Sequence, residues 1–139
     1  SGLKLIHGST IHGMQLTGPR SSVPTTYYGE QSGIGLLLNA HQGLKQDLNI
    51  DVVGLGCGVL ATYGRATDRM HMIEINPAVI SIANTHFSFL RDSKVKISTH
   101  VGDGRLVLER MGREGVDVLI LDAFSSDAIP AHLLTREAF

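Results

Sequence analysis

The feature that most constrains the fold is a glycine-rich turn that directly follows a short apolar run. Residues 51–64 read DVVGLGCGVLATYG, with glycines at every second position: Gly54, Gly56 and Gly58. Glycine permits a tight turn and lets a ligand approach the bare backbone closely. An apolar strand, such a turn and a helix are recurring parts of nucleotide-binding α/β domains. The stretch therefore predicts a site for a nucleoside compound.

Strand-like and helix-like segments alternate along the chain after residue 50. Strand patterns cover residues 50–55, 69–75, 94–103 and 116–124, and helical patterns cover 31–46, 59–67, 77–87 and 104–112. Alternating strands and helices imply a parallel sheet, and strands that are apolar on both faces imply helices on both faces. The predicted class is α/β: a Rossmann-like, three-layer fold around a mostly parallel sheet.

The first thirty residues have a different pattern. Apolar residues alternate over 3–5 and 11–16 around turn residues Gly8 and Ser9, which predicts a small N-terminal β-hairpin. We divide the chain into a hairpin and loop segment, residues 1–30, and a nucleoside-binding domain, residues 31–139. The last residues, LLTREAF, read like the first turn of a helix, so we expect the sequence to be part of a longer protein.

Composition narrows the classes of partner. Hydrophobic residues make up 42% of the 139 residues and the net charge is −1, so we expect a core and no nucleic-acid partner. No apolar run approaches the ~18–20 residues of a membrane span, so this segment should make no membrane contact. A single cysteine, Cys57, fits a reducing compartment and suggests a cytoplasmic location. The seven histidines lack metal-site spacing, so no metal is expected, although His12 is a candidate ligand contact.

Acidic residues end three successive predicted strands. Glu74 lies roughly 20 residues beyond the glycine turn, and Asp103 and Asp122 end the next two strands. The carboxyl ends of parallel strands meet at one edge, where such sheets bind ligands. Glu74 suits two ribose hydroxyls and Asp103 suits an adenine amino group. The G-x-G-x-G spacing, in place of the G-x-G-x-x-G of dinucleotide sites, is typical of sites for S-adenosylmethionine-type compounds.

Four motifs, in this order and spacing, carry a family resemblance: GLGCG, IEINP, HVGDGR and LDAFSSDAIP. They resemble the spermidine synthase (polyamine aminopropyltransferase) family, within the S-adenosylmethionine-dependent methyltransferase superfamily. HGMQ and TTYYGEQSG resemble the N-terminal β-segment and the tyrosine motif of the same family. The resemblance implies a transferase that moves an aminopropyl group from decarboxylated S-adenosylmethionine to a polyamine acceptor. The chain holds about four of the seven strands of the superfamily, and a free sheet edge favours a homodimer.

The resemblance also implies roles for individual residues. Asp122 would be the catalytic residue, accepting a proton from the attacking amine. Tyr28 would line the amine groove, and Asp127 is either a second amine-binding acid or the N-cap of a following helix. Cofactor binding would fall to seven residues: Gln15, Gly54, Gly56, Gly58, Glu74, Asp103 and Gly104.

Two departures from the family pattern keep alternatives open. Spermidine synthases usually carry GGGDG at the glycine turn, and its aspartate recognises the amine of the decarboxylated donor, whereas Cys57 stands here. The segment after Asp122 is also shifted. One alternative is a methyltransferase that uses S-adenosylmethionine itself. Another is a non-catalytic adenosyl-binding domain of a larger membrane-associated protein.

Overall fold

The computed structural model describes residues 1–112, 115–123 and 129–136 of the chain. Strand β1 (Gly2–His7) pairs antiparallel with β2 (Thr10–Leu16), which confirms the hairpin predicted at the N-terminus. The other strands form a four-stranded sheet in the order β5-β4-β3-β6, and every neighbouring pair in it is parallel. Its members are β3 (Asn49–Val53), β4 (Arg69–Glu74), β5 (Lys96–Val101) and β6 (Val118–Leu121).

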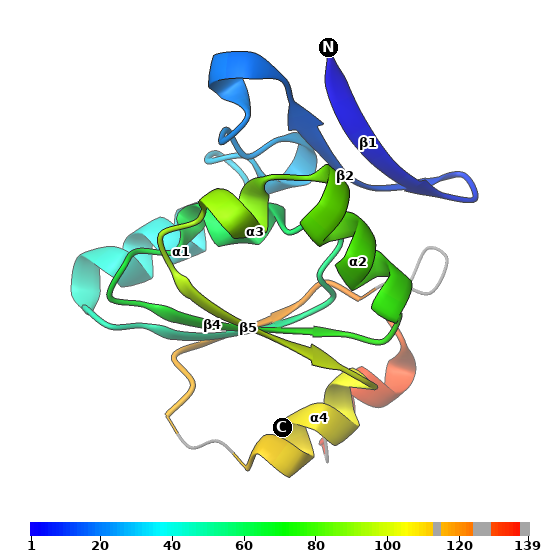
Figure 1. The fold of residues 1–139 in the computed structure, drawn as a ribbon. Helices are drawn as coiled ribbons and strands as arrows, with labels where there is room; N and C mark the ends of the chain where they lie inside the picture. Colours follow the sequence, from blue (N-terminus) through cyan, green and yellow to red (C-terminus); the bar gives the residue numbers. More distant parts are fainter. Residues whose placement is uncertain (113–114, 124–128, 137–139) are drawn as a thin grey trace.

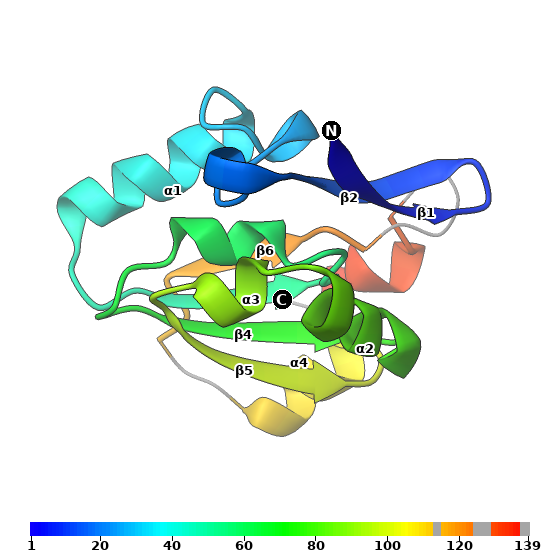
Figure 2. The same cartoon turned by 45° about the horizontal axis from the view of Figure 1, so that its top comes forward.

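Helices cover both faces of this sheet, which confirms the predicted three-layer α/β class (Figure 1). The helices are α1 (Gly33–Leu44), α2 (Pro77–His86), α3 (Phe89–Asp92) and α4 (Gly104–Met111). Helices α1, α2 and α3 lie on one face and α4 lies on the other. The hairpin extends above the face that carries α1, α2 and α3 (Figure 2).

Local sequence explains where the longer helices begin. The side chains of Ser32, Asn76 and Asp103 each accept a hydrogen bond from a backbone N–H in the first turn of α1, α2 and α4. Pro77 occupies the first position of α2, where its missing N–H costs nothing. Gly112 ends α4 in the left-handed conformation, so this helix begins and ends where the sequence predicts.

Two apolar clusters hold the layers together. Alternate side chains of β3, β4 and β6, such as Ile50, Met72 and Ile120, point to the larger cluster, which Leu38 of α1 joins. The opposite side chains, among them Val53 and Ile73, pack on Val107 of α4 and on Leu133. Side chains on both faces of β3 are buried, as in parallel sheets that helices cover on both sides.

The helix predicted at residues 59–67 is wrong in type and length. A 3₁₀ helix forms instead and covers only Val59–Tyr63. Gly64 follows it with extended backbone, and an ideal Cβ at Gly64 would lie 2.3 Å from the Val95 side chain. The chain therefore leaves the helix where it packs closely on the segment before β5. The glycine turn here is followed by one short turn and has no long helix whose N-terminus would bind a ligand.

Asp68 lies at the end of the sheet where the parallel strands begin, opposite the strand ends that carry the acids. Its carboxylate is 1% exposed and accepts hydrogen bonds from the backbone N–H of Leu48 and of Arg65, both at 2.9 Å. The Arg65 guanidinium also lies 2.9 Å from it. These contacts join the residues that precede β3 and β4.

Replacing Asp68 by alanine should lower the free energy of unfolding by about 2–4 kcal/mol, because two backbone donors lose their acceptor in a buried place. Urea unfolding measures the change. Asp92→Ala is the matched control, since Asp92 belongs to an exposed ion pair with Arg91, and its unfolding midpoint should not move. Equal effects of the two substitutions would contradict this account.

Candidate active site

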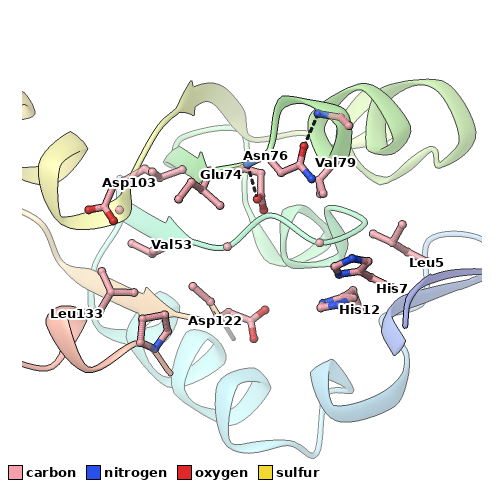
Figure 3. Close-up of a pocket in the computed structure, with 18 of the residues that line it drawn as sticks. Leu5, His7, His12, Val53, Glu74, Asn76, Val79, Asp103, Asp122 and Leu133 are labelled. Atoms are coloured by element: carbon pink, nitrogen blue, oxygen red, sulfur yellow. Dashed lines mark hydrogen bonds between the residues drawn. The ribbon is translucent and has the colours of Figure 1, made fainter. Parts of the chain in front are cut away.

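A cavity of about 480 Å³ opens at the carboxyl ends of the parallel strands. Its volume lies within the range of sites for small ligands. Glu74, Asp103 and Asp122 all line it, together with Gly54 and Gly56 of the glycine turn. Figure 3 shows the three acidic side chains placed around one shared space. The structure therefore brings together the acids that the strand pattern singles out.

Backbone N–H groups fix the carboxylate of Glu74 at the end of β4. Oε2 accepts a hydrogen bond from Leu55 N at 3.1 Å, and Oε1 accepts one from Asn76 N at 3.0 Å. Each carboxylate oxygen can accept a second hydrogen bond. Glu74 is thus a positioned double acceptor on the cavity wall, which suits a pair of neighbouring hydroxyl groups.

Asp103 lies at the next strand end and has two partners. Oδ1 accepts a hydrogen bond from Leu106 N at 3.1 Å as the N-cap of α4, and Oδ2 lies 2.8 Å from Nε2 of His132. The Leu106 N–H, and then His132, lower the pKa of this carboxyl below its ordinary range. Gly104 follows on the same wall, where an ideal Cβ would lie 2.4 Å from a methyl group of Val53.

Asp122 differs from the other two acids because it lies in an apolar place. The hydroxyl of Tyr28 donates a hydrogen bond of 2.5 Å to its Oδ2. Burial raises the pKa of Asp122 from 3.8 to about 6, and the hydrogen bond from Tyr28 opposes this rise. Burial also raises the pKa of Tyr28, which is 6% exposed, so its hydroxyl keeps its proton. The pair thus consists of a carboxyl group whose pKa lies close to neutral pH and a hydroxyl group that is fixed as its hydrogen-bond donor.

Gly54 allows β6 to end beside the glycine turn. Its φ is +100°, and an ideal Cβ would lie 2.4 Å from the carbonyl oxygen of Asp122. The neighbouring ladder continues, since Asp122 N donates to the Val53 carbonyl and Gly54 N donates to the Ile73 carbonyl, both at 2.8 Å. Any side chain at Gly54 would push Asp122 away. The glycine is therefore needed for the position of the acid as well as for the turn.

The hairpin forms the wall of the cavity opposite the strand ends. Leu5, His7 and His12 line it there, and Figure 3 shows the two histidines side by side. The His12 carbonyl oxygen would lie 2.7 Å from an ideal Cβ at Gly56, so the hairpin rests directly on the turn. The sequence singled out His12 as a candidate ligand contact, and His12 does line the cavity, whereas nothing in the hairpin pattern singled out Leu5 or His7.

Some predicted site residues lie elsewhere. Gln15 is 4% exposed and does not line the cavity: its side-chain amide donates to Ser21 O and Ser88 Oγ and accepts from Ser88 N. Gly58 also lies away from the cavity, against Leu90. Asp127 lies outside the described residues. The roles of these three residues remain predictions.

A second groove of about 290 Å³ adjoins the cavity. Asp122 and Tyr28 line both spaces. Apart from Asp122, the described walls of the groove are aromatic or aliphatic: Tyr27, Tyr28, Ile34, Leu60, Ile120 and Leu121. The Asp122 carboxylate thus lies on the wall that the cavity and the groove share.

Two further observations concern the described residues only. They contain no group of three histidine, cysteine, aspartate or glutamate side chains that would hold a metal ion. Among them there is also no helix with the length and apolar character needed to cross a membrane.

Comparisons with known proteins agree with the fold. A polyamine aminopropyltransferase of Vibrio vulnificus is 37% identical over 108 residues, which are 74% of this chain and 34% of that protein. The eEF1A lysine and N-terminal methyltransferases of Danio rerio and Xenopus laevis are 31% and 29% identical over 69% of this chain. The chain covers 15% and 14% of these two proteins. No protein-family model matches the chain.

Fold, cavity and relatives together define the class, which is the S-adenosylmethionine-dependent methyltransferase superfamily. Within that class the chain is a homologue of a polyamine aminopropyltransferase, which supports a place in the spermidine synthase-like family. It spans about a third of the length of that relative.

The unusual pKa of Asp122 has a consequence for stability. Its folded-state value of about 6 exceeds the ordinary 3.8, so the folded chain binds this proton more tightly than the unfolded chain. The stabilisation is complete below the unfolded pKa and is lost as the pH rises through the folded pKa. Asp122→Asn should therefore raise the free energy of unfolding at neutral pH by about 2 kcal/mol and change it little near pH 4. Urea unfolding at the two pH values measures this.

Asp117→Asn provides a control of opposite sign. The backbone N–H of Asn49, and then Lys45, hold the pKa of Asp117 below its ordinary value, so its stabilisation is present at neutral pH and lost in acid. Asp117→Asn should therefore destabilise the chain at neutral pH. The account of Asp122 fails if its asparagine variant is also destabilised there.

Proposed function

We propose that the chain is the donor-binding part of a spermidine synthase-like aminopropyltransferase. The reaction would move an aminopropyl group from decarboxylated S-adenosylmethionine to a polyamine acceptor, a small-molecule amine. The observation that carries the proposal is the position of Asp122, a half-buried carboxylate on the wall between a cavity with nucleoside-type acceptors and an apolar groove. The relative named polyamine aminopropyltransferase supports it.

The donor would lie along the cavity. Glu74 would accept both ribose hydroxyls, because its two oxygens are held by backbone N–H groups and keep accepting capacity. Asp103 and Gly104 would lie at the purine end. The turn at Gly54 and Gly56 would bring bare backbone under the sulfonium and direct the transferred group toward Asp122.

The chemistry needs one proton acceptor. An alkylammonium ion has no lone pair, so it must lose a proton before its nitrogen attacks. The proton would pass to the Asp122 carboxylate. The freed nitrogen would form a bond to the methylene carbon beside the sulfonium, and the carbon–sulfur bond would break with its electrons passing to sulfur. The leaving group, 5′-methylthioadenosine, is a neutral thioether and needs no acid.

The properties of Asp122 fit this role. A pKa of about 6 leaves the carboxylate mostly ionised at neutral pH and keeps it a competent proton acceptor. The hydroxyl of Tyr28 fixes its orientation. The low polarity of the groove strengthens the attraction between this carboxylate and a cationic amine.

One observation favours a second candidate, a methyltransferase that uses S-adenosylmethionine itself. Cys57 replaces the family's donor-binding aspartate and is fully buried against Gly13 of the hairpin. Burial raises the pKa of its thiol to about 11, so it carries no charge to pair with the donor's amine. Relatives named methyltransferases point the same way. The remaining alternative is a non-catalytic adenosyl-binding domain of a larger membrane-associated protein.

The proposal includes a cytoplasmic homodimer. The buried free thiol of Cys57 suits a reducing compartment. Exposed apolar side chains on the hairpin, Leu3, Ile6 and Ile11, suit contact with a second copy. Sedimentation velocity tests the dimer, and a monomer at all concentrations would exclude it.

The experiment is to incubate the chain with an amine acceptor and each donor in turn, and to identify the nucleoside product by mass spectrometry. Aminopropyl transfer predicts 5′-methylthioadenosine from the decarboxylated donor, whereas methyl transfer predicts S-adenosylhomocysteine from S-adenosylmethionine. Asp122→Asn should reduce transfer by about 10²–10⁴-fold, because asparagine cannot take the proton. Donor affinity measured by calorimetry should stay unchanged.

Asp92→Asn is the matched control, because Asp92 is an exposed acid on α3 that does not line the cavity. It should leave transfer and binding unchanged. Tight donor binding without any product would support the non-catalytic alternative. Loss of donor binding in Asp122→Asn would show that this residue has a different role.

A further inference from the structure

We propose that Tyr63 is a positioning residue for the pair of Tyr28 and Asp122: its hydroxyl holds the backbone of Tyr28 so that the Tyr28 hydroxyl stays aligned with the carboxylate. The inference rests on the proposed function, in which Asp122 takes the proton. It adds a residue that lines neither the cavity nor the groove. Tyr63 is the last residue of the 3₁₀ helix Val59–Tyr63 and lies 35 positions from Tyr28 along the chain.

Two hydrogen bonds in series connect Tyr63 to Asp122. The Tyr63 hydroxyl donates to the carbonyl oxygen of Tyr28 at 2.5 Å, and the Tyr28 hydroxyl donates to Oδ2 of Asp122, also at 2.5 Å. A carbonyl oxygen only accepts hydrogen bonds, so Tyr63 must be the donor of the first. Burial, and then the charge of Glu30, raise the pKa of Tyr63, so its hydroxyl keeps the proton that this bond needs.

Helix α1 holds Tyr63 at two points. Nε2 of Gln42 donates to the carbonyl oxygen of Tyr63 at 2.5 Å. An ideal Cβ at Gly35 would lie 2.8 Å from the hydroxyl oxygen of Tyr63, so the backbone of α1 packs directly on that oxygen. Tyr63 is therefore a fixed point from which the backbone of Tyr28 can be held.

The segment that carries Tyr28 has a strained backbone. Thr26 has a φ of +58°, which lies in the left-handed region and is rare for a β-branched residue. Such a conformation persists only where neighbouring contacts hold it. The hydroxyl of Thr25 holds one side of the segment by donating to the Met14 carbonyl, and Tyr63 holds the other side. Without the second contact the backbone would relax and displace the Tyr28 hydroxyl.

Apolar packing alone does not set this alignment. The Tyr28 side chain is 6% exposed and belongs to the larger apolar cluster. Apolar contacts have no preferred direction, whereas a hydrogen bond weakens steeply as its angle departs from linear. A small shift of the backbone therefore weakens the bond to Asp122 while the ring stays buried. Since this bond opposes the rise of the Asp122 pKa, its loss raises that pKa further.

The pKa of Asp122 is the property to measure, because its titratable partners keep one charge state near neutral pH. These partners are the Tyr28 hydroxyl and the Cys57 thiol, and burial raises the pKa of both, that of Cys57 to about 11. The other titratable groups on the described walls of the cavity and the groove belong to His7, His12, Tyr27, Glu74, Asp103 and His132. A measurement on the Asp122 carboxyl carbon itself separates its titration from theirs.

The test is an NMR titration of the Asp122 carboxyl carbon, whose signal is assigned by its absence from Asp122→Asn. Tyr63→Phe keeps the ring and removes only the hydroxyl, and it should move the titration midpoint up by about half a pH unit or more. Tyr28→Phe should also move it up. When added to Tyr28→Phe, Tyr63→Phe should cause no further rise, because its effect passes through the Tyr28 hydroxyl. The acid limb of kcat/KM for transfer should move in parallel.

Thr62→Val is the matched control. Thr62 is half-buried like Tyr63 and precedes it in the same 3₁₀ helix, but its hydroxyl donates within that helix, to the Val59 carbonyl at 2.8 Å. Its loss should leave the midpoint of Asp122 unchanged, and thermal melting checks that each variant is folded.

Two results would overturn the inference. One is an unmoved midpoint in folded Tyr63→Phe, and the other is an equal rise from Tyr63→Phe with and without the Tyr28 hydroxyl. A moved midpoint in a chain that transfers no group from either donor would support the positioning by Tyr63 and would instead overturn the proposed function.

Discussion

The site depends on one close approach of backbone to backbone. Gly54 and the carbonyl group of Asp122 are so near one another that no side chain fits between them. This contact sets the end of β6 beside the glycine turn that follows β3, and it places the carboxylate of Asp122 next to the bare main chain. The proposed donor, lying on the turn, would have its reactive end at Asp122. The cavity, the groove and the proposed proton transfer all follow from that geometry.

The acids around the cavity have different surroundings and therefore different chemistry. Glu74 and Asp103 accept hydrogen bonds from backbone N–H groups, which hold their carboxylates in place. Asp122 has no such support among the described residues and relies on the Tyr28 hydroxyl, so burial raises its pKa toward neutrality. The two acids proposed to bind the donor and the proposed proton acceptor thus arise from one repeated motif, an acid at a strand end.

The sequence predicted the elements and the acids better than it predicted the walls of the site. Strand and helix patterns identified the sheet, and the rule for parallel strand ends brought Glu74, Asp103 and Asp122 to one edge. The helical pattern gave a wrong prediction at residues 59–67, because Gly64 packs against Val95 and the chain leaves the helix there. The sequence assigned no role to His132, whose pairing with Asp103 depends on how Leu133 packs. Gln15 is the opposite case: the sequence assigned it a role in the site, but its side chain hydrogen-bonds Ser88 and joins the hairpin to that residue.

A crystal structure of the chain with 5′-methylthioadenosine bound tests the central claim most directly. The account predicts both ribose hydroxyls on the Glu74 carboxylate, the purine between Asp103 and Leu133, and the sulfur on the glycine turn facing Asp122. A nucleoside bound elsewhere, or one bound in the cavity with its sulfur turned away from Asp122, would contradict the account.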